Sequence, residues 1–258
     1  CRESLKNGAA RIVVVNSGNA NTFTGRKGRD AVQMTAEFAA SAVGSAPSEV
    51  YVASTGVIGE PMDASKFAHL LGGLATSAKA ENTEAAARAI MTTDTYPKLA
   101  TRAVKLGDTT IYINGFCKGA GMIAPDMATM LCFIFTDAAI AQPVLQHMIS
   151  AHTKTTFNCM TVDGDTSTSD TCLLFATGAA ARRGQKPISD FANPRLRPFE
   201  EALGDLMRDL AIQIARDGEG LTKFVTFEVS GAEDWAAARK IALACANSPI
   251  LKTAIAGE

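Results

Sequence analysis

Thr129 is the residue whose position in the sequence best suits covalent catalysis. It stands in the stretch KGAGMIAPDMATML, residues 118–131, after a glycine-rich turn and before a strand-like apolar run. A threonine becomes a nucleophile when the peptide bond before it breaks, because the freed α-amine, with a pKa near ~8, can take the hydroxyl proton. The small residue Ala128 and the pair Pro125-Asp126 suit such a break. Threonine is also common at strand starts, because its branched side chain fits a pleated sheet, so these residues alone leave both interpretations open.

Four polar loops that follow apolar segments are further candidates for a site. Rigid strands often present functional loops at their ends, so binding and catalytic residues gather there. Small hydroxyl and amide residues are also ordinary turn formers, and each loop taken alone is more often explained as a turn. The loops cover residues 16–21, 54–56, 92–95 and 118–121.

The sequence contains no motif for a metal, a phosphate group or a serine hydrolase. The loop 163–170 begins with the acidic spacing of an EF-hand, but Thr168 replaces the glycine of the sixth position and Leu174 the glutamate of the twelfth. We therefore expect this loop to be held by its own hydroxyl-to-backbone hydrogen bonds. The turn at residues 119–121 lacks the end of a phosphate-binding loop, and no G-x-S-x-G sequence occurs. The cysteines include no pair at zinc-ligand spacing.

The composition is that of an ordinary globular protein. The 258 residues are 47% hydrophobic and 20% charged, with a formal net charge of -1, and they suffice for a large core. There is no basic tract and no apolar run long enough to cross a bilayer, so we expect neither nucleic acid nor membrane as a partner. Scattered cysteines are typical of the reducing cytoplasm. The sequence begins with Cys1 rather than Met, which suggests a segment of a longer chain.

Predicted strands and helices are mixed without the strict alternation of a doubly wound sheet, which indicates an α/β fold. The strongest predicted helix opens at Pro198 and stops at Asp217-Gly218, with apolar residues on one face. Residues 178–194 are predicted to form a long exposed loop. Strands are predicted at residues 11–15, 50–53, 99–106, 109–116, 130–135, 172–176 and 223–229, and further helices at residues 28–43, 63–75, 83–91, 142–151 and 235–245.

Seven ordered motifs, spread through nearly the whole chain, resemble the ornithine acetyltransferase (ArgJ) family of bifunctional enzymes of arginine biosynthesis. The resemblance implies an α/β fold built as a layered αββα-type sandwich of mixed sheets. It also implies a cytoplasmic acyltransferase, a glutamate N-acetyltransferase that uses no cofactor and no metal. The motifs are VNSGNAN, STGVIG, TTDTYPK, KGAGMIAPDMATML, FNCMTVDGDTSTSDT, RDGEGLTKF and ANSPILKTAI.

The resemblance implies that the chain cuts itself between Ala128 and Thr129. Residues 1–128 are then the end of an α chain and residues 129–258 the start of a β chain, within one catalytic unit that assembles as an α2β2 heterotetramer. Thr129 is implied to take the acetyl group of N-acetylornithine and to pass it to glutamate in a second half-reaction, which is ping-pong covalent catalysis. Acetyl-CoA as an additional acetyl donor is left open.

The resemblance also implies an oxyanion hole made by the Thr55 hydroxyl and the Gly56 amide. The tetrahedral intermediate of acyl transfer needs preorganised donors, each of which typically contributes ~3 kcal/mol. Glycine suits the second position because its amide can approach the substrate with no side chain in the way.

Substrate contacts are implied for Thr92, Lys118, Thr129 and Glu219. The substrate carries a carboxylate and an ammonium group, so one cation and one anion in the pocket fix its direction. Thr95 is the alternative to Thr92, because both are threonines of the TTDT motif. Without the motifs, Lys118 would be interpreted as a solvated turn lysine and Glu219 as a surface carboxylate.

Three alternatives remain open from the sequence. A self-processing aminopeptidase or amidohydrolase of the same superfamily would pass the acyl group to water. In the second alternative Cys1 acts as an N-terminal nucleophile, although its neighbours are charged. The third is a catalytically incomplete fragment, because family members are longer at both ends. Asp126 stands where many relatives have asparagine, which bears on the rate of self-cleavage.

Overall fold

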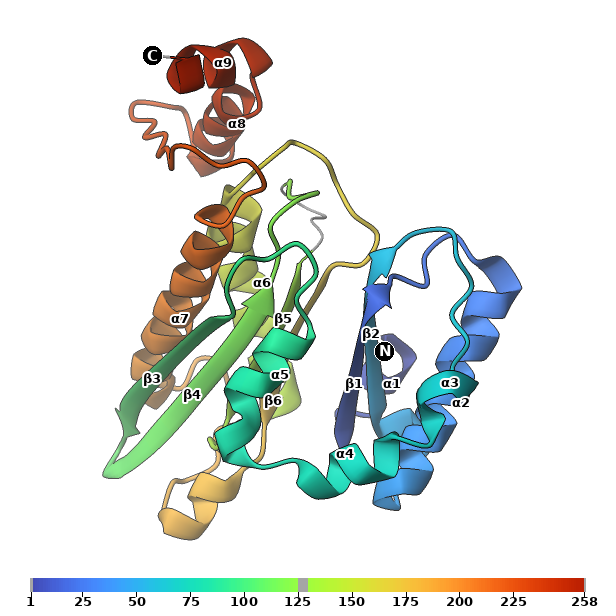
Figure 1. Ribbon diagram of the computed structural model, residues 1–258. Coiled ribbons are helices and arrows are strands. Elements are labelled where there is room, and N and C mark those ends of the chain that lie inside the picture. Colours follow the sequence, from blue (N-terminus) through green and yellow to red (C-terminus); the bar gives the residue numbers. More distant parts are fainter. Residues whose placement is uncertain (1, 125–129, 258) are drawn as a thin grey trace. The chain divides into compact units, whose positions relative to one another are not determined.

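The computed structural model describes residues 2–124 and 130–257, which divide into two compact units, Cys1–Thr92 and Thr93–Glu258 (Figure 1). Cys1, Asp126, Ala128 and Thr129 of the sequence-based predictions therefore lie outside the described residues. In the described part, no helix is both long and apolar enough to cross a membrane.

The first unit is built on two parallel strands, β1 (Ile12–Asn19) and β2 (Val50–Val57). Both are rich in valine, whose branched side chain suits a strand. The long helix α2 (Gly25–Val43) packs on this pair and ends at Gly44, whose φ of 66° is the left-handed conformation that terminates helices. The shorter helices are α1 (Arg2–Leu5), α3 (Ser65–Ala68), α4 (Leu71–Ser77) and α5 (Thr83–Ala89).

Both strands of the first unit are longer than the sequence predicted. The polar residues expected to follow them as loops are in the parallel ladder, where Asn16 faces Ser54 and Gly18 faces Gly56. Backbone hydrogen bonding between the two strands therefore continues past the end of the apolar run. Thr55, expected in a loop, lies inside β2.

The second unit contains a four-stranded sheet in the order β3-β4-β5-β6. The hairpin of β3 (Lys98–Leu106) and β4 (Thr109–Lys118) turns at Gly107, with a φ of 65°, at the predicted turn. Strand β5 (Leu131–Thr136) runs antiparallel to β4, and β6 (Thr171–Ala176) runs parallel to β5.

Two helices, α6 (Gln142–Thr155) and α7 (Arg197–Ala215), pack on this sheet (Figure 1). The predicted apolar face of α7 is confirmed. Gly115 of β4 leaves room for it, because a Cβ there would lie 2.9 Å from Leu210 Cδ1. The face consists of five fully buried residues, Phe199, Leu203, Leu206, Leu210 and Ile214.

The α/β class predicted from the sequence is confirmed, with open sheets of mixed strand direction. The predicted strand at residues 223–229 is wrong, because in the described part of the chain it pairs with no strand and has no regular secondary structure. An alternating pattern makes a strand only where a sheet edge offers hydrogen-bond partners. The chain then forms α8 (Trp235–Ala246) and α9 (Pro249–Gly257).

The long exposed loop predicted at residues 178–194 is wrong in part. It contains a short 3-10 helix, Ala179–Arg183, and Ile188 is 2% exposed and bridges to Ile140. Burial of this apolar side chain holds the segment against the second unit's core. Other 3-10 helices are Pro47–Glu49, Ala80–Asn82, Phe157–Cys159 and Pro194–Leu196.

Candidate active site

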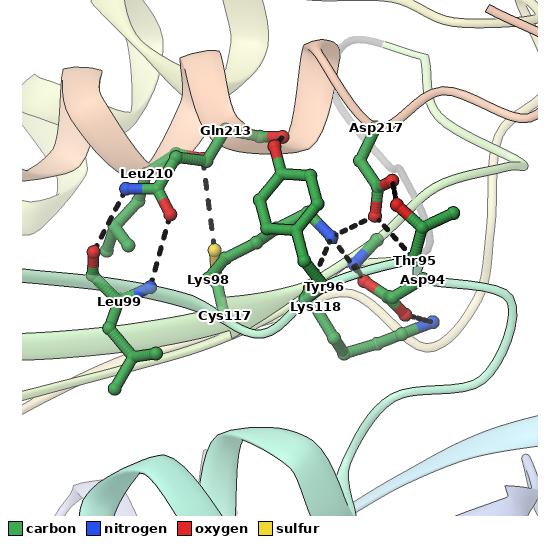
Figure 2. Close-up of polar contacts among 11 residues, drawn as sticks. Asp94, Thr95, Tyr96, Lys98, Leu99, Cys117, Lys118, Leu210, Gln213 and Asp217 are labelled. Atoms are coloured by element: carbon green, nitrogen blue, oxygen red, sulfur yellow. Dashed lines mark hydrogen bonds and ion pairs between the residues drawn. The ribbon is translucent and has the colours of Figure 1, made fainter.

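A buried lysine between two buried carboxylates is the main electrostatic feature of the second unit (Figure 2). Lys98 begins β3, and its Nζ lies 2.7 Å from Asp94 Oδ1 and 2.6 Å from Asp217 Oδ2. Burial alone would lower the pKa of Lys98, but the hydrogen bonds to Asp217 and Asp94 outweigh it and raise that pKa above its ordinary value. A charge this deep is tolerated only when it is paired, so Lys98 stays protonated and ties the loop before β3 to the end of α7.

Asp94 joins this lysine to a second one. Its Oδ1 also accepts the Gly119 amide at 2.7 Å, and its Oδ2 lies 3.7 Å from Lys118 Nζ (Figure 2). Burial opposes ionisation of Asp94, yet the hydrogen bonds of Lys98 and Gly119 and the charges of both lysines hold its pKa below the usual range. Asp94 is therefore a fixed anion to which the end of β4 is attached.

Lys118 is 2% exposed, which excludes the solvated turn lysine that its sequence alone would suggest. It is the last residue of β4, next to Gly119, whose φ is 155°. Burial lowers the pKa of Lys118, and the charge of Lys98 adds to this, while Asp94 and Glu219 act in the opposite direction. An ammonium group with so little water around it gains strongly from an additional anion, such as a substrate carboxylate.

Glu219 lies close to the glycine turn that follows Lys118. Its amide donates to the Ala120 carbonyl at 2.8 Å, and a Cβ on Gly121 would lie 2.5 Å from the Glu219 carboxylate carbon. Glycine at position 121 therefore makes room for that carboxylate. Glu219 therefore lies beside the turn that follows Lys118, and its charge acts on the Lys118 ammonium, while the substrate contacts of both residues stay predictions.

Two threonines, Thr92 and Thr95, are the alternatives for substrate contact. Thr95 contacts the charge cluster, which is the set of buried charged residues Asp94, Lys98, Lys118 and Asp217. Its amide and its hydroxyl both donate to the Asp217 carboxylate (Figure 2). Thr92 is exposed and ends the first unit. Thr95 thus has a structural role in orienting Asp217, and the choice of Thr92 for substrate contact stays a prediction.

The implied oxyanion-hole residues lie in β2 of the first unit. Thr55 is 1% exposed, and within the described residues its hydroxyl has no hydrogen-bond partner. Buried hydroxyl groups are nearly always hydrogen-bonded, so a solitary one is unusual and suits a group that waits for a ligand. Gly56 has a φ of 127°, and a Cβ there would lie 2.3 Å from the Gly18 carbonyl carbon, so only glycine fits.

Asp170 is a titratable residue that sequence reasoning missed. One of its oxygens accepts the Met130 amide at 3.1 Å, and its Oδ2 is buried without a partner among the described residues. Burial raises the pKa of Asp170 to about 7, against smaller lowering effects of the Met130 hydrogen bond and the charge of Lys118. A carboxyl group that titrates near neutrality beside the residue after Thr129 is a functional candidate.

Carboxylates and a hydroxyl group of the acidic loop 163–170 accept hydrogen bonds from backbone amides. Asp163 accepts the Met122 and Ile123 amides, and the Ser167 hydroxyl accepts the Ser169 amide. The predicted hydrogen bonds between hydroxyl groups and the backbone are thus present, but carboxylates accept more of the backbone amides than hydroxyl groups do. Across the residues that the structure describes, no group of three or more histidine, cysteine or acidic side chains could hold a metal ion.

Comparison with known proteins gives a consistent result. The family model described as "ArgJ family" matches residues 1–258. The "Arginine biosynthesis bifunctional protein ArgJ" of Rhizobium meliloti (strain 1021) is 61% identical over 258 residues, which are 100% of this chain and 62% of the relative. The protein of the same name from Brucella suis biovar 1 (strain 1330) is 60% identical with the same coverage. The chain thus spans about 62% of the length of these relatives.

Two solved structures are also similar. One is the arginine biosynthesis bifunctional protein argJ from Bacillus halodurans, 32% identical with a TM-score of 0.41, covering 46% of this chain and 61% of that chain. The other is ornithine acetyltransferase from Mycobacterium tuberculosis in complex with ornithine, 32% identical with a TM-score of 0.42, covering 48% and 67%. The family model covers every residue of the sequence, and this chain belongs to the ArgJ family.

Proposed function

We propose that this chain is part of an acetyltransferase of arginine biosynthesis that moves an acetyl group from N-acetylornithine to glutamate. Two facts support it: relatives named for arginine biosynthesis are about 60% identical over the whole chain, and the seven family motifs occur in order. The enzyme would work in the cytoplasm, as an α2β2 assembly of self-cleaved chains.

The covalent chemistry centres on Thr129. In the uncut precursor its hydroxyl oxygen attacks the Ala128 carbonyl carbon, the Ala128–Thr129 C–N bond breaks, and the hydroxyl proton passes to the nitrogen that becomes the amine. Water then hydrolyses the resulting ester, which leaves a carboxylate on Ala128 and restores the hydroxyl. The new α-amine serves as the base for acetyl transfer. Residues 1–128 and 129–258 thereby become the adjoining parts of the two chains.

Two half-reactions then share the same threonine. The hydroxyl oxygen attacks the acetyl carbon of N-acetylornithine, and the departing nitrogen takes up a proton as ornithine leaves. The glutamate amine attacks the acetyl-threonine ester, the C–O bond breaks, and the proton returns to the threonine oxygen. Lys118 and Glu219 would bind the carboxylate and ammonium groups that both amino acids carry, with Thr92 as a further contact.

The observation that carries this proposal is the buried, unpartnered Thr55 hydroxyl. It is the first of the two donors that the family resemblance assigns to the oxyanion hole, and the adjacent Gly56 can only be glycine. A donor without a partner in the resting protein is preorganised for a charge that develops only in the transition state.

The test compares Thr129→Ala with Thr129→Ser in the full-length gene product. The native protein and the serine variant should give two chains by intact mass, and acetylglutamate from N-acetylornithine plus glutamate. The alanine variant should remain one chain and form no acetylglutamate. Acetyl transfer by uncut Thr129→Ala protein would refute the proposal.

The same assay separates the alternative functions. An aminopeptidase or amidohydrolase would release free acetate at the same rate with or without glutamate, because water accepts the acyl group. A catalytically incomplete protein would form neither product. Replacing N-acetylornithine by acetyl-CoA shows whether the enzyme accepts that second donor.

A further inference from the structure

The loop 161–171 holds the backbone on both sides of residues 125–129. On one side, the Asp163 carboxylate accepts the Met122 and Ile123 amides, and the Val162 amide donates to the Ile123 carbonyl at 2.9 Å. Ile123 is 0% exposed, so this flank is anchored in the core.

The other flank is held in the same way. Asp170 accepts the Met130 amide at 3.1 Å, and the Thr171 amide donates to the Met130 carbonyl at 3.0 Å. Met130 is 5% exposed and leads into β5. Met130 directly follows Thr129 in the chain, so Asp170 holds the first described residue after the proposed nucleophile.

We propose that Asp163 and Asp170 are positioning residues that hold the two flanks of the Ala128–Thr129 bond, and that Asp170 is the member whose ionisation controls self-cleavage. This inference rests on the proposed function. It is specific to a bond broken within the chain: two anchors from one loop keep the reacting groups in register before the cut and keep both new ends in place after it.

The two carboxylates differ in one respect. Asp163 uses both oxygens, since Oδ2 accepts the Met122 amide and Oδ1 the Ile123 and Asp165 amides. Asp170 uses only Oδ1, and its buried Oδ2 has no partner among the described residues. Burial raises the pKa of Asp170 to about 7, and the charged side chain that acts on it is Lys118, at the end of β4.

The direction of the pH effect follows from the hydrogen bond. An ionised carboxylate accepts from an amide roughly twice as strongly as a neutral carboxyl group does. Loss of the Asp170 proton therefore tightens the hold on the Met130 amide. Between pH 6 and pH 8 the ionised fraction of a group with a pKa of about 7 rises roughly tenfold, and cleavage should accelerate by a similar factor.

The experiment follows cleavage of precursor made by cell-free translation, diluted into buffers of pH 6 and pH 8. Asp170→Asn keeps the size and the acceptor oxygen but removes the ionisation. We expect it to cleave about tenfold more slowly than native precursor at pH 8 and within about twofold of it at pH 6. Asp163→Asn should slow cleavage by a similar factor at both pH values.

Asp137→Asn is the matched control, because Asp137 also accepts a backbone amide, that of Tyr112, but just after the far end of β5. It should cleave at the native rate, and melting curves confirm that each variant is folded. Native cleavage and pH dependence in Asp170→Asn, with Thr129→Ala uncut, would overturn this inference alone. Cleavage of Thr129→Ala would overturn the proposed function instead. If Asp170→Asn fails to fold, Asp170→Glu replaces it and should keep a pH-dependent rate.

Discussion

The Lys98 ammonium lies 2.7 Å from an Asp94 carboxylate oxygen, and neither side chain is exposed to solvent. Such a pair adds little stability over an apolar one, because both charges are removed from water. The contribution of the Lys98–Asp94 pair is to fix the position of neighbouring groups. Asp94 is held from one side by Lys98 and receives Lys118 on the other, so the buried cation at the end of β4 has a defined position.

Replacing Lys98 by methionine should destabilise the protein strongly. The substitution keeps the apolar stem but leaves Asp217 without its buried cation and Asp94 with Lys118 alone. Breaking a buried ion pair in this way typically costs about 3–5 kcal/mol. Urea unfolding of native and variant protein measures the loss. Arg88→Ala is the control: it breaks an ion pair whose side chains are 59% and 61% exposed, and it should cost less than about 1 kcal/mol. Equal losses in both variants would contradict the view that burial makes the Lys98 cluster important.

Asp94→Asn should weaken substrate binding and shift its pH dependence. Burial already lowers the pKa of Lys118, and Asp94 partly offsets this. Removing the Asp94 charge lowers that pKa further, so Lys118 loses its proton, and its attraction for a carboxylate, at a lower pH. We expect KM for both amino acids to rise, by up to about tenfold and more at higher pH than at lower pH, since a lost charge-assisted contact costs about 1.5 kcal/mol or more. KM measured against pH tests this; an unchanged KM profile would show that Asp94 does not act through Lys118.

Local patterns in the sequence were sufficient to predict most elements of the fold. The α7 face and the β3–β4 hairpin are encoded by residue spacing and by a glycine turn within a few positions. The prediction of a strand at 223–229 was wrong because a strand also needs the edge of a neighbouring strand as a hydrogen-bonding partner. A local sequence pattern does not indicate whether such an edge is available. For the same reason β1 and β2 are longer than predicted, because each supplies the other's partners.

The charge cluster could be predicted only in part. The TTDTYPK motif and Lys118 point to the region, but nothing nearby in sequence indicates that Asp217 completes the pairing of Lys98. Topology brings it there, since α7 packs along β3 and ends beside its first residue. Asp170 was missed because the acidic spacing of its loop suggested only a calcium site. The lack of a partner for its buried oxygen follows from the three-dimensional structure and not from the sequence.

Thr55→Val should separate catalysis from stability. Valine has nearly the shape of threonine and removes a buried hydroxyl that makes no hydrogen bond within the described residues, so the free energy of unfolding should stay within about 1 kcal/mol of the native value or rise. Loss of an oxyanion donor should lower kcat about 10²- to 10³-fold. Thr55→Ser, which keeps the hydroxyl, should retain most of the activity. A valine variant with native kcat would remove Thr55 from the proposed oxyanion hole.

Asp170→Asn should gain stability relative to the native protein as the pH rises. Burial raises the pKa of Asp170 to about 7, above the ordinary value of 3.8, so between these two values the folded state binds more protons than the unfolded state. Native stability therefore falls as the pH increases through this window, and the asparagine variant lacks this loss. Melting temperatures of both proteins at pH 5, 6, 7 and 8 measure the difference, which should grow in favour of Asp170→Asn up to about pH 7 and then level off. A difference that is constant across this range would mean that Asp170 titrates as an ordinary exposed carboxyl group, and would remove the basis for its proposed control of self-cleavage.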